Sequence, residues 1–341
     1  MASSPPSPPA APANPPSSSG RLPGLEVLRC VAAICVLLLH TRAVFGGRFV
    51  FGRGYLGVDF FLMLSGYLMA RTQEIRLADG LNPWRFMVTR YRRLWPMMAA
   101  GGLIGIPMQY LRSQGLWHFV WVTTANMLLI PVPFQPFIFP LNIPAWTIFF
   151  EMVANGLHVT LLWRLRGVWL GIMLAGLVVA MAAIGAWHGS FDVGAKPGTF
   201  WAAVPRVLLA YLLGVGLYRW WRDHPPLAVP PALALVIMPV IVAGAWFFGI
   251  RGWLFDLVFV VAICPLMIAG ALRLVRFGRA AGIIGQLSFP LFALQMPVLQ
   301  GLRHFNSGAW TGGLVALAVG IAGALAAAWF KSRGKPAPRP A

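Results

Sequence analysis

Apolar stretches of about 20 residues recur along the chain from Leu25 almost to Phe330, and short polar segments separate them. A membrane-spanning α-helix needs about 20 mostly apolar residues, because lipid offers no partner for an unpaired backbone group. The pattern therefore predicts an all-α polytopic membrane protein, a bundle of about ten transmembrane helices. The predicted spans are 25–44, 55–70, 91–110, 143–163, 167–187, 200–219, 228–248, 252–272, 284–302 and 309–330.

The segment 115–135 is also apolar, but Pro131 and Pro133 interrupt it. It is either an eleventh span or a re-entrant loop. Ten spans with a cytoplasmic N-terminus place 19 of the 27 basic residues on the cytoplasmic side, including the six arginines from Arg71 to Arg93. An eleventh span would reverse every later loop and remove this asymmetry. The positive-inside rule therefore favours ten spans with both termini cytoplasmic.

Composition supports the membrane class and limits the partners. Of the 341 residues 59% are hydrophobic and only 10% are charged, too few charges for the surface of a soluble protein of this size. The net charge of +19 raises the question of a nucleic-acid ligand. However, the basic residues are spread over the helix ends, where lipid headgroups and membrane topology explain them. We therefore expect membrane lipids as partners and no nucleic acid; the oligomeric state has no signal in the sequence.

The ends of the chain differ from the apolar middle. Residues 1–20 are rich in Pro, Ser and Ala and predict a disordered cytoplasmic tail, while residues 332–341 form a short basic cytoplasmic tail. The three cysteines, Cys30, Cys35 and Cys264, lie inside apolar runs without disulfide or metal-ligand spacing. We interpret them as buried packing thiols, and no metal site is expected.

The first span carries two ionisable residues, whose presence in a membrane helix has to be explained. Arg29 and His40 are eleven positions apart, so on a helix they lie about 20° apart around the axis and about 16 Å apart along it. Ionisable groups are costly in hydrocarbon and mark functional sites by default. His40 is either a satisfied core histidine or a general base, since imidazole titrates near neutral pH. Its shared face with Arg29 favours the second interpretation.

Two carboxylates fall within predicted spans. Asp59 opens the second span, and Glu151 lies inside the fourth. Glu151 is a candidate for the chemistry, or it pairs with an intramembrane arginine to fix helix packing. Asp59 is a candidate for substrate binding or a contact at a helix N-terminus. Arg206, early in the sixth span, binds substrate or extends toward the interface.

The segment from Arg90 to Pro96 begins the third span with a basic cluster. In the simpler interpretation these arginines only anchor the helix end on the cytoplasmic side of the membrane. The functional one is a polyanion site, because guanidinium groups bind phosphate in bidentate fashion. Arg29 would add to Arg90 and Arg93 at the same end, which points to a phosphate-bearing donor that approaches from the cytoplasm.

These residues occur in the order of a known family. The Arg29–His40 pattern, the stretch Gly57–Tyr67 with Ser65, the motif Arg90–Pro96 and the stretch Ala145–Glu151 resemble the motifs of the membrane-bound acyltransferase-3 family. Weaker similarities follow at 206–214 and 287–295, so the resemblance runs from about residue 24 to 330. One departure is Gln295, because many relatives carry His near that position.

The resemblance implies an integral membrane O-acyltransferase domain over residues 21–331. Its members move an acyl group, commonly acetyl, from cytoplasmic acyl-CoA to a hydroxyl of an extracytoplasmic polysaccharide or lipid-linked sugar, typically in the bacterial inner membrane. It makes His40 the catalytic base and gives Glu151 an active-site role. It also places Arg29, Arg90 and Arg93 near the coenzyme A phosphates.

A second class of function remains open from the sequence, a transporter or flippase of a glycan or lipid without acyl-transfer chemistry. It would use the same buried polar groups for binding alone. Inverted internal repeats would favour it, and none is visible in the sequence.

Overall fold

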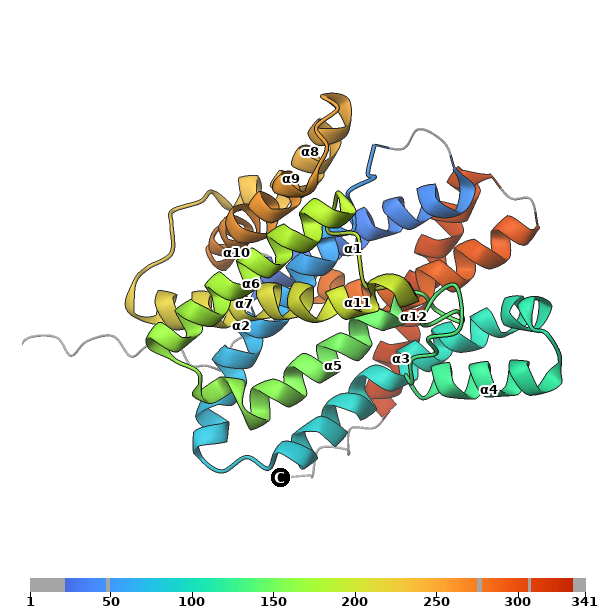
Figure 1. The fold of residues 1–341 in the computed structure, drawn as a ribbon, viewed down its shortest axis with the longest axis horizontal. Coiled ribbons are helices and arrows are strands. Elements are labelled where there is room, and N and C mark those ends of the chain that lie inside the picture. The colour runs from blue at the N-terminus through green and yellow to red at the C-terminus, as the bar shows by residue number, and fades with distance from the viewer. Residues whose placement is uncertain (1–21, 47–49, 275–277, 306–307, 334–341) are drawn as a thin grey trace, which may run out of the picture.

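The computed structural model describes residues 22–46, 50–274, 278–305 and 308–333, which are helical with irregular connections and contain no strand (Figure 1). The predicted tail of residues 1–20 and most of the tail of residues 332–341 lie outside the described residues. The longer helices are α1 (Pro23–Phe45), α2 (Leu56–Ala78), α3 (Pro83–Arg112), α6 (Gly167–His188), α7 (Ala203–Asp223), α11 (Gly278–His304) and α12 (Ala309–Arg333). The shorter elements are α4 (Leu116–Met127), α5 (Ala145–Thr160), η1 (Leu162–Arg164), η2 (Pro197–Ala202), α8 (Pro231–Phe247), α9 (Trp253–Val258), η3 (Phe259–Ile263) and α10 (Cys264–Leu272).

Each of the ten predicted spans overlaps a helix or a run of neighbouring helical elements. In the described part of the chain six are long and apolar enough to cross a membrane: α1, α6, α7 with η2, the run α9–η3–α10, α11 and α12. The α8 helix is apolar but has only 17 residues. The protein is therefore a multi-pass membrane protein, and ten crossings remain a prediction.

The segment 115–135 does not form a spanning helix. It contains α4, which has 12 residues and is therefore about 18 Å long, too short for a hydrocarbon core of about 30 Å. The chain then continues to Pro144 without a regular element. Figure 1 shows α4 beside the C-terminal half of α3. The indole of Trp95 on α3 fixes the end of α4, because its Nε1–H donates to the Met127 carbonyl at 2.8 Å.

The most extensive helix contact joins α2 and α7, which run parallel. Contacting pairs advance together along both helices, from Asp59–Arg206 to Glu74–Arg219. Between them the backbones touch, because a Cβ added at Gly66 would overlap the Tyr211 carbonyl. Small residues permit such close crossings in membrane proteins, where van der Waals packing drives helix association.

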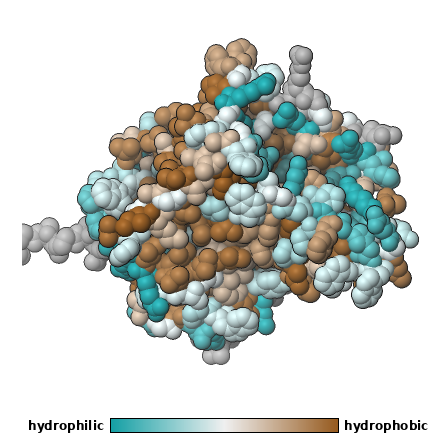
Figure 2. Space-filling view, in the orientation of Figure 1, coloured by the Kyte–Doolittle hydropathy of each residue, from teal (hydrophilic) through white to brown (hydrophobic). Residues whose placement is uncertain are grey.

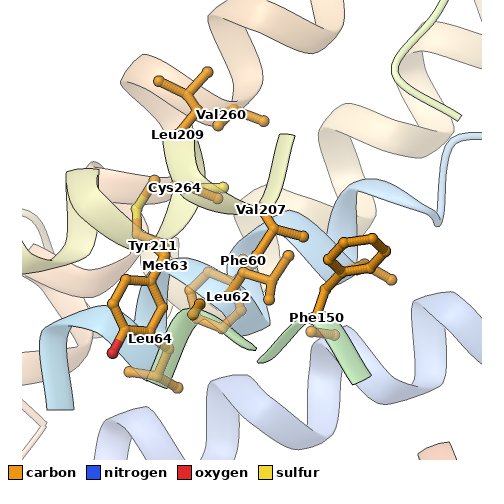
Figure 3. Close-up of a cluster of buried hydrophobic side chains, with 14 of the residues drawn as sticks. Phe60, Leu62, Met63, Leu64, Phe150, Val207, Leu209, Tyr211, Val260 and Cys264 are labelled. Atoms are coloured by element: carbon orange, nitrogen blue, oxygen red, sulfur yellow. The ribbon is translucent and has the colours of Figure 1, made fainter. Parts of the chain in front are cut away.

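The buried apolar core surrounds this crossing. Figure 3 shows side chains of α2 and α7 packed together with α5, η3 and α10. All three cysteines are free and buried, as predicted for packing thiols. The labelled residues of this core are Phe60, Leu62, Met63, Leu64, Phe150, Val207, Leu209, Tyr211, Val260 and Cys264.

The substitution Gly66→Ala should destabilise the protein by about 1–3 kcal/mol, because its methyl group would force α2 and α7 apart. The melting temperature of the detergent-purified protein measures the effect. The matched control is Gly216→Ala on α7, where a Cβ would meet only the methyl groups of Leu170 and Leu174 at 3.8 Å. Equal melting temperatures for the two variants would contradict the close crossing.

A second parallel pair, α1 and α11, packs against α12 and α3. A Cβ added at Gly285 would overlap Glu26 near the start of both helices, and Arg303 donates to the Val44 carbonyl near their ends. In both contacts the residue of α11 follows its partner on α1 by the same number of positions in the sequence. The two helices therefore run side by side with a constant offset in residue number. Residues of α11 can therefore be placed beside their counterparts on α1.

The outer surface is suited to lipid. On α6 the exposed Trp169 and Trp187 are separated by about 27 Å along the axis, close to the thickness of a hydrocarbon core. Tryptophan is enriched at membrane interfaces. Figure 2 shows hydrophobic residues over the middle of one face, with hydrophilic residues toward its left and right ends. This distribution fits a bundle whose middle lies in lipid.

Candidate active site

A cavity of about 280 Å³ opens between α1, α2, α3, α5 and α11. Its polar lining contains five of the eight predicted site residues: Arg29, Ser65, Arg90, Arg93 and Glu151. These come from four helices, so no single helical face holds them. We call this the inner cavity. Its apolar end includes Phe61 and Phe292, whose rings meet edge to face with centroids 5.8 Å apart.

A hydrogen-bonded triad lies in the wall of the inner cavity. Arg90 Nη2 lies 2.6 Å from Glu151 Oε1 and 3.2 Å from Ser65 Oγ. The Ser65 hydroxyl donates to the same carboxylate oxygen at 2.8 Å. Glu151 is thus paired with an intramembrane arginine, one of the two interpretations of its position, and it also faces the cavity. The triad holds the carboxylate in a fixed orientation.

Arg29 and Arg93 leave more of their charge available than Arg90. Arg29 has one loose ion pair, 3.9 Å from Glu26. Arg93 is exposed, and within the described residues its guanidinium has no hydrogen-bond or ion-pair partner. Two guanidinium groups that face one cavity with few internal partners form a ready anion site.

His40 lies outside the inner cavity. It is partly buried on α1, and its Nδ1 atom is buried without a hydrogen-bond partner in the described part of the chain. The helix carries it about 16 Å beyond Arg29, as the spacing predicted. The structure does not bring His40 and Glu151 into one cavity.

Asp59 and Arg206 bind each other and do not line the inner cavity. Arg206 Nε and Nη2 donate to the two carboxylate oxygens at 2.9 and 2.7 Å. The remaining donors reach the carbonyls of Val193 and Tyr55 at 2.8 and 3.1 Å. Both side chains are only 1% exposed. The predicted contact of this pair with substrate stays a prediction.

Two further polar clusters were not predicted from the sequence. Arg219 binds Glu74, and the buried His158 places its Nε2 atom 3.7 Å from the same carboxylate. At the opposite end of α2, Arg53 pairs with Asp256 of α9. The only sequence signal was the rarity of acidic residues, eight in the whole chain, which makes each intramembrane carboxylate a candidate partner for an arginine.

Gln295 of α11 is completely buried, and within the described residues neither of its amide atoms has a hydrogen-bond partner. Unpartnered buried amides are rare, since each costs about 1–3 kcal/mol. The sequence singled out this residue as a departure from the family pattern. Across the described residues no group of three or more His, Cys, Asp or Glu side chains is arranged to hold a metal ion.

Comparison with known proteins identifies the family of the chain. The family model for an acyltransferase domain, of the acyltransferase-3 family, matches residues 22–333. The chain is similar to the exopolysaccharide production protein ExoZ of Rhizobium meliloti (strain 1021), with 27% identity over 280 residues that cover 75% of this chain and 79% of the relative. It is also similar to protein 2 in the picA locus of Rhizobium radiobacter, with 30% identity over 155 residues that cover 39% of this chain and 78% of the relative. No solved structure matches the chain.

Proposed function

Because the chain belongs to the acyltransferase-3 family and is an acyltransferase, we propose a specific activity for it. It is an O-acetyltransferase of the bacterial inner membrane. The donor is cytoplasmic acetyl-CoA. The acceptor is a hydroxyl of an extracytoplasmic polysaccharide or of a lipid-linked sugar. The similarity to a protein named for exopolysaccharide production supports a glycan acceptor.

We propose ten crossings with both termini cytoplasmic. The parallel pairing of α2 and α7 supports this topology, because these helices are the second and sixth of ten alternating spans. An eleventh crossing at 115–135 would make them antiparallel. In this orientation the ends of the helices that carry Arg29, Arg90 and Arg93 face the cytoplasm.

The observation that carries the donor assignment is the convergence of Arg29, Arg90 and Arg93 on one cavity. The inner cavity, at about 280 Å³, lies at the lower limit of ligand pockets, so it suits the acylated arm of the donor rather than its nucleotide. The phosphates would lie at the mouth against Arg29 and Arg93. Arg90, held by Glu151, would complete the positive end.

In the proposed reaction His40 accepts the proton of the acceptor hydroxyl. The hydroxyl oxygen attacks the thioester carbonyl, the C–S bond breaks, and coenzyme A leaves as the thiolate. The alternative path passes through an acyl-enzyme, and both use the same base. Glu151 orients Arg90 and Ser65 along the path of the acyl group.

The test of this function uses membranes that contain the full chain, labelled acetyl-CoA and polysaccharide whose O-acetyl groups have been removed by mild alkali. We expect label in the polysaccharide, in an alkali-labile ester. Membranes without the protein are the control. Absence of labelled ester, together with movement of polysaccharide or lipid across the membrane, would support the transporter instead.

Replacing Arg93 by glutamine should raise the KM for acetyl-CoA about tenfold with little change in kcat, because a charged contact to phosphate is worth about 1.5–3 kcal/mol. The measurement is initial rate against acetyl-CoA concentration. Arg92→Gln is the matched control, since Arg92 is exposed and does not line the inner cavity. An equal rise in KM for both variants would indicate a general effect of surface charge.

A further inference from the structure

A second cavity, of about 460 Å³, lies at the other end of the bundle. It is formed by the end of α3, the start of α4, the connection 134–140 and one residue of α11, Gln300. It shares no lining residue with the inner cavity. We call it the outer cavity.

Among the residues that the structure describes, the lining of the outer cavity is rich in amides and contains no carboxylate. Four glutamines line it together with Arg112 and His118, and the rings of Phe134 and Phe137 complete it. Each amide offers both donors and acceptors, which matches the hydroxyl groups of a sugar. Aromatic rings offer flat apolar surface for the C–H faces of a sugar ring. Among the described lining residues one guanidinium accompanies four amides, which favours hydroxyl groups over a phosphate cluster.

Three of the polar lining groups, the side chains of Gln109, His118 and Gln135, are held in place before any ligand binds. The imidazole of His118 is fixed at both nitrogens, because Nδ1 accepts from the Gln114 backbone N–H at 3.2 Å and Nε2 lies 2.6 Å from the amide of Gln135. The Gln109 amide donates to Ser113 Oγ at 3.2 Å. Such preorganisation lowers the entropic cost of binding.

The connection that follows α4 is anchored as well. Val132 N–H donates to the Ile138 carbonyl at 3.0 Å, and Leu141 N–H donates to the buried Asn126 side chain at 3.2 Å. Asn142 reaches across to α11, where its amide donates to the Ala293 carbonyl at 2.8 Å. Pro297, four residues on, leaves that carbonyl without its usual helical donor. The irregular segment is therefore a fixed part of the cavity wall.

The outer cavity adjoins the level of His40. Because α1 and α11 advance in register, Gln300 lies beside the turn of α1 that contains His40 and Thr41. The inner cavity reaches Phe292, about 12 Å back along α11. Between these levels lies the Gln295 amide, and His40 lies at the outer end of the interval; within the described residues neither the Gln295 amide nor His40 Nδ1 has a hydrogen-bond partner. Polar groups without partners thus occupy the interval between the two cavities.

We propose that the outer cavity is the acceptor site and binds a saccharide through its glutamine amides and Arg112. This assignment rests on the proposed function for its orientation toward the outside of the membrane. It places the acceptor and the phosphates of the donor at opposite ends of the bundle, so the acylated arm of the donor has to extend beyond the inner cavity to bring the thioester to the hydroxyl. The base then lies on the acceptor side, where the hydroxyl must lose its proton.

Binding of saccharide to the purified full chain in detergent tests the site without any acyl transfer. The probe is a set of oligosaccharides prepared from the host polysaccharide and freed of O-acetyl groups by mild alkali, and titration calorimetry measures Kd. We expect Gln300→Leu and Arg112→Leu each to weaken binding about tenfold. The matched control is Gln286→Leu, an exposed residue of α11 outside both cavities, which should leave Kd unchanged.

The outcomes separate the site from the reaction. Wild-type protein that binds no saccharide, or binding that is the same in Gln300→Leu, Arg112→Leu and Gln286→Leu, overturns the site. Saccharide binding that these variants weaken, in a protein that transfers no acetyl group, supports the site and overturns the proposed function. In transfer assays we expect Gln300→Leu to raise the KM for acceptor while the KM for acetyl-CoA stays the same.

Discussion

Replacing His40 by alanine should lower the kcat of acetyl transfer by about 10²- to 10⁴-fold, the range that a positioned general base contributes. The KM for acetyl-CoA should change little, because His40 does not line the inner cavity that we assign to the donor. The measurement is the rate of labelled ester formation at saturating acetyl-CoA. The loss then appears in kcat and equally in kcat/KM.

The reason for so large an effect is the isolation of His40. Its Nδ1 atom is buried and has no partner in the described part of the chain, so the neighbouring residues do not account for it structurally. Across the described residues, no other histidine lies in the part of the bundle between the inner cavity and the outer cavity. A water molecule without a base would have to accept the proton, which is slower at neutral pH.

Two control variants make the outcome decisive. His304→Ala removes an exposed imidazole at the end of α11 and should leave the rate unchanged. His40→Gln keeps hydrogen-bonding capacity without a titratable group and should be as inactive as His40→Ala. Activity in His40→Gln close to that of wild type would show that His40 only fills space or donates a hydrogen bond. Full activity in His40→Ala would remove the proposed mechanism.

The positions of the helices could be predicted from hydropathy. Runs of about 20 apolar residues identified the helices, because the requirement for internal backbone hydrogen bonding applies to each segment separately. The segment 115–135 could not be assigned by that criterion. Its conformation depends on contacts with distant residues, such as Asn142 with Ala293 and Trp95 with Met127. No local pattern encodes those contacts.

The site could be predicted residue by residue but not as a constellation. Spacing within one helix correctly related Arg29 to His40 in distance, but it could not show that Arg29 lines the inner cavity and that His40 does not. The triad of Ser65, Arg90 and Glu151 joins three helices, so periodicity carried no information about it. The outer cavity gave no signal, because its four glutamines are scattered over two helices and two connections and form no pattern in the sequence.

The buried pair of Asp59 and Arg206 should give the largest loss of stability. Replacing Arg206 by leucine should cost about 3–5 kcal/mol, because it leaves the Asp59 carboxylate buried and uncompensated. It also removes the donors to the Val193 and Tyr55 carbonyls. The change in unfolding free energy can be measured by denaturation with sodium dodecyl sulfate in mixed micelles.

The matched control for this loss is Arg222→Leu, further along the same helix. Arg222 pairs with Asp223, but both side chains are more than half exposed, at 64% and 62%. An exposed pair of this kind contributes at most about 1 kcal/mol.

The double variant Asp59→Leu/Arg206→Leu removes both charges, so it should be more stable than Arg206→Leu alone. If the double variant folds and keeps the wild-type KM for donor and acceptor, the pair acts in packing α2 against α7; a raised KM for acceptor would support the predicted contact with substrate.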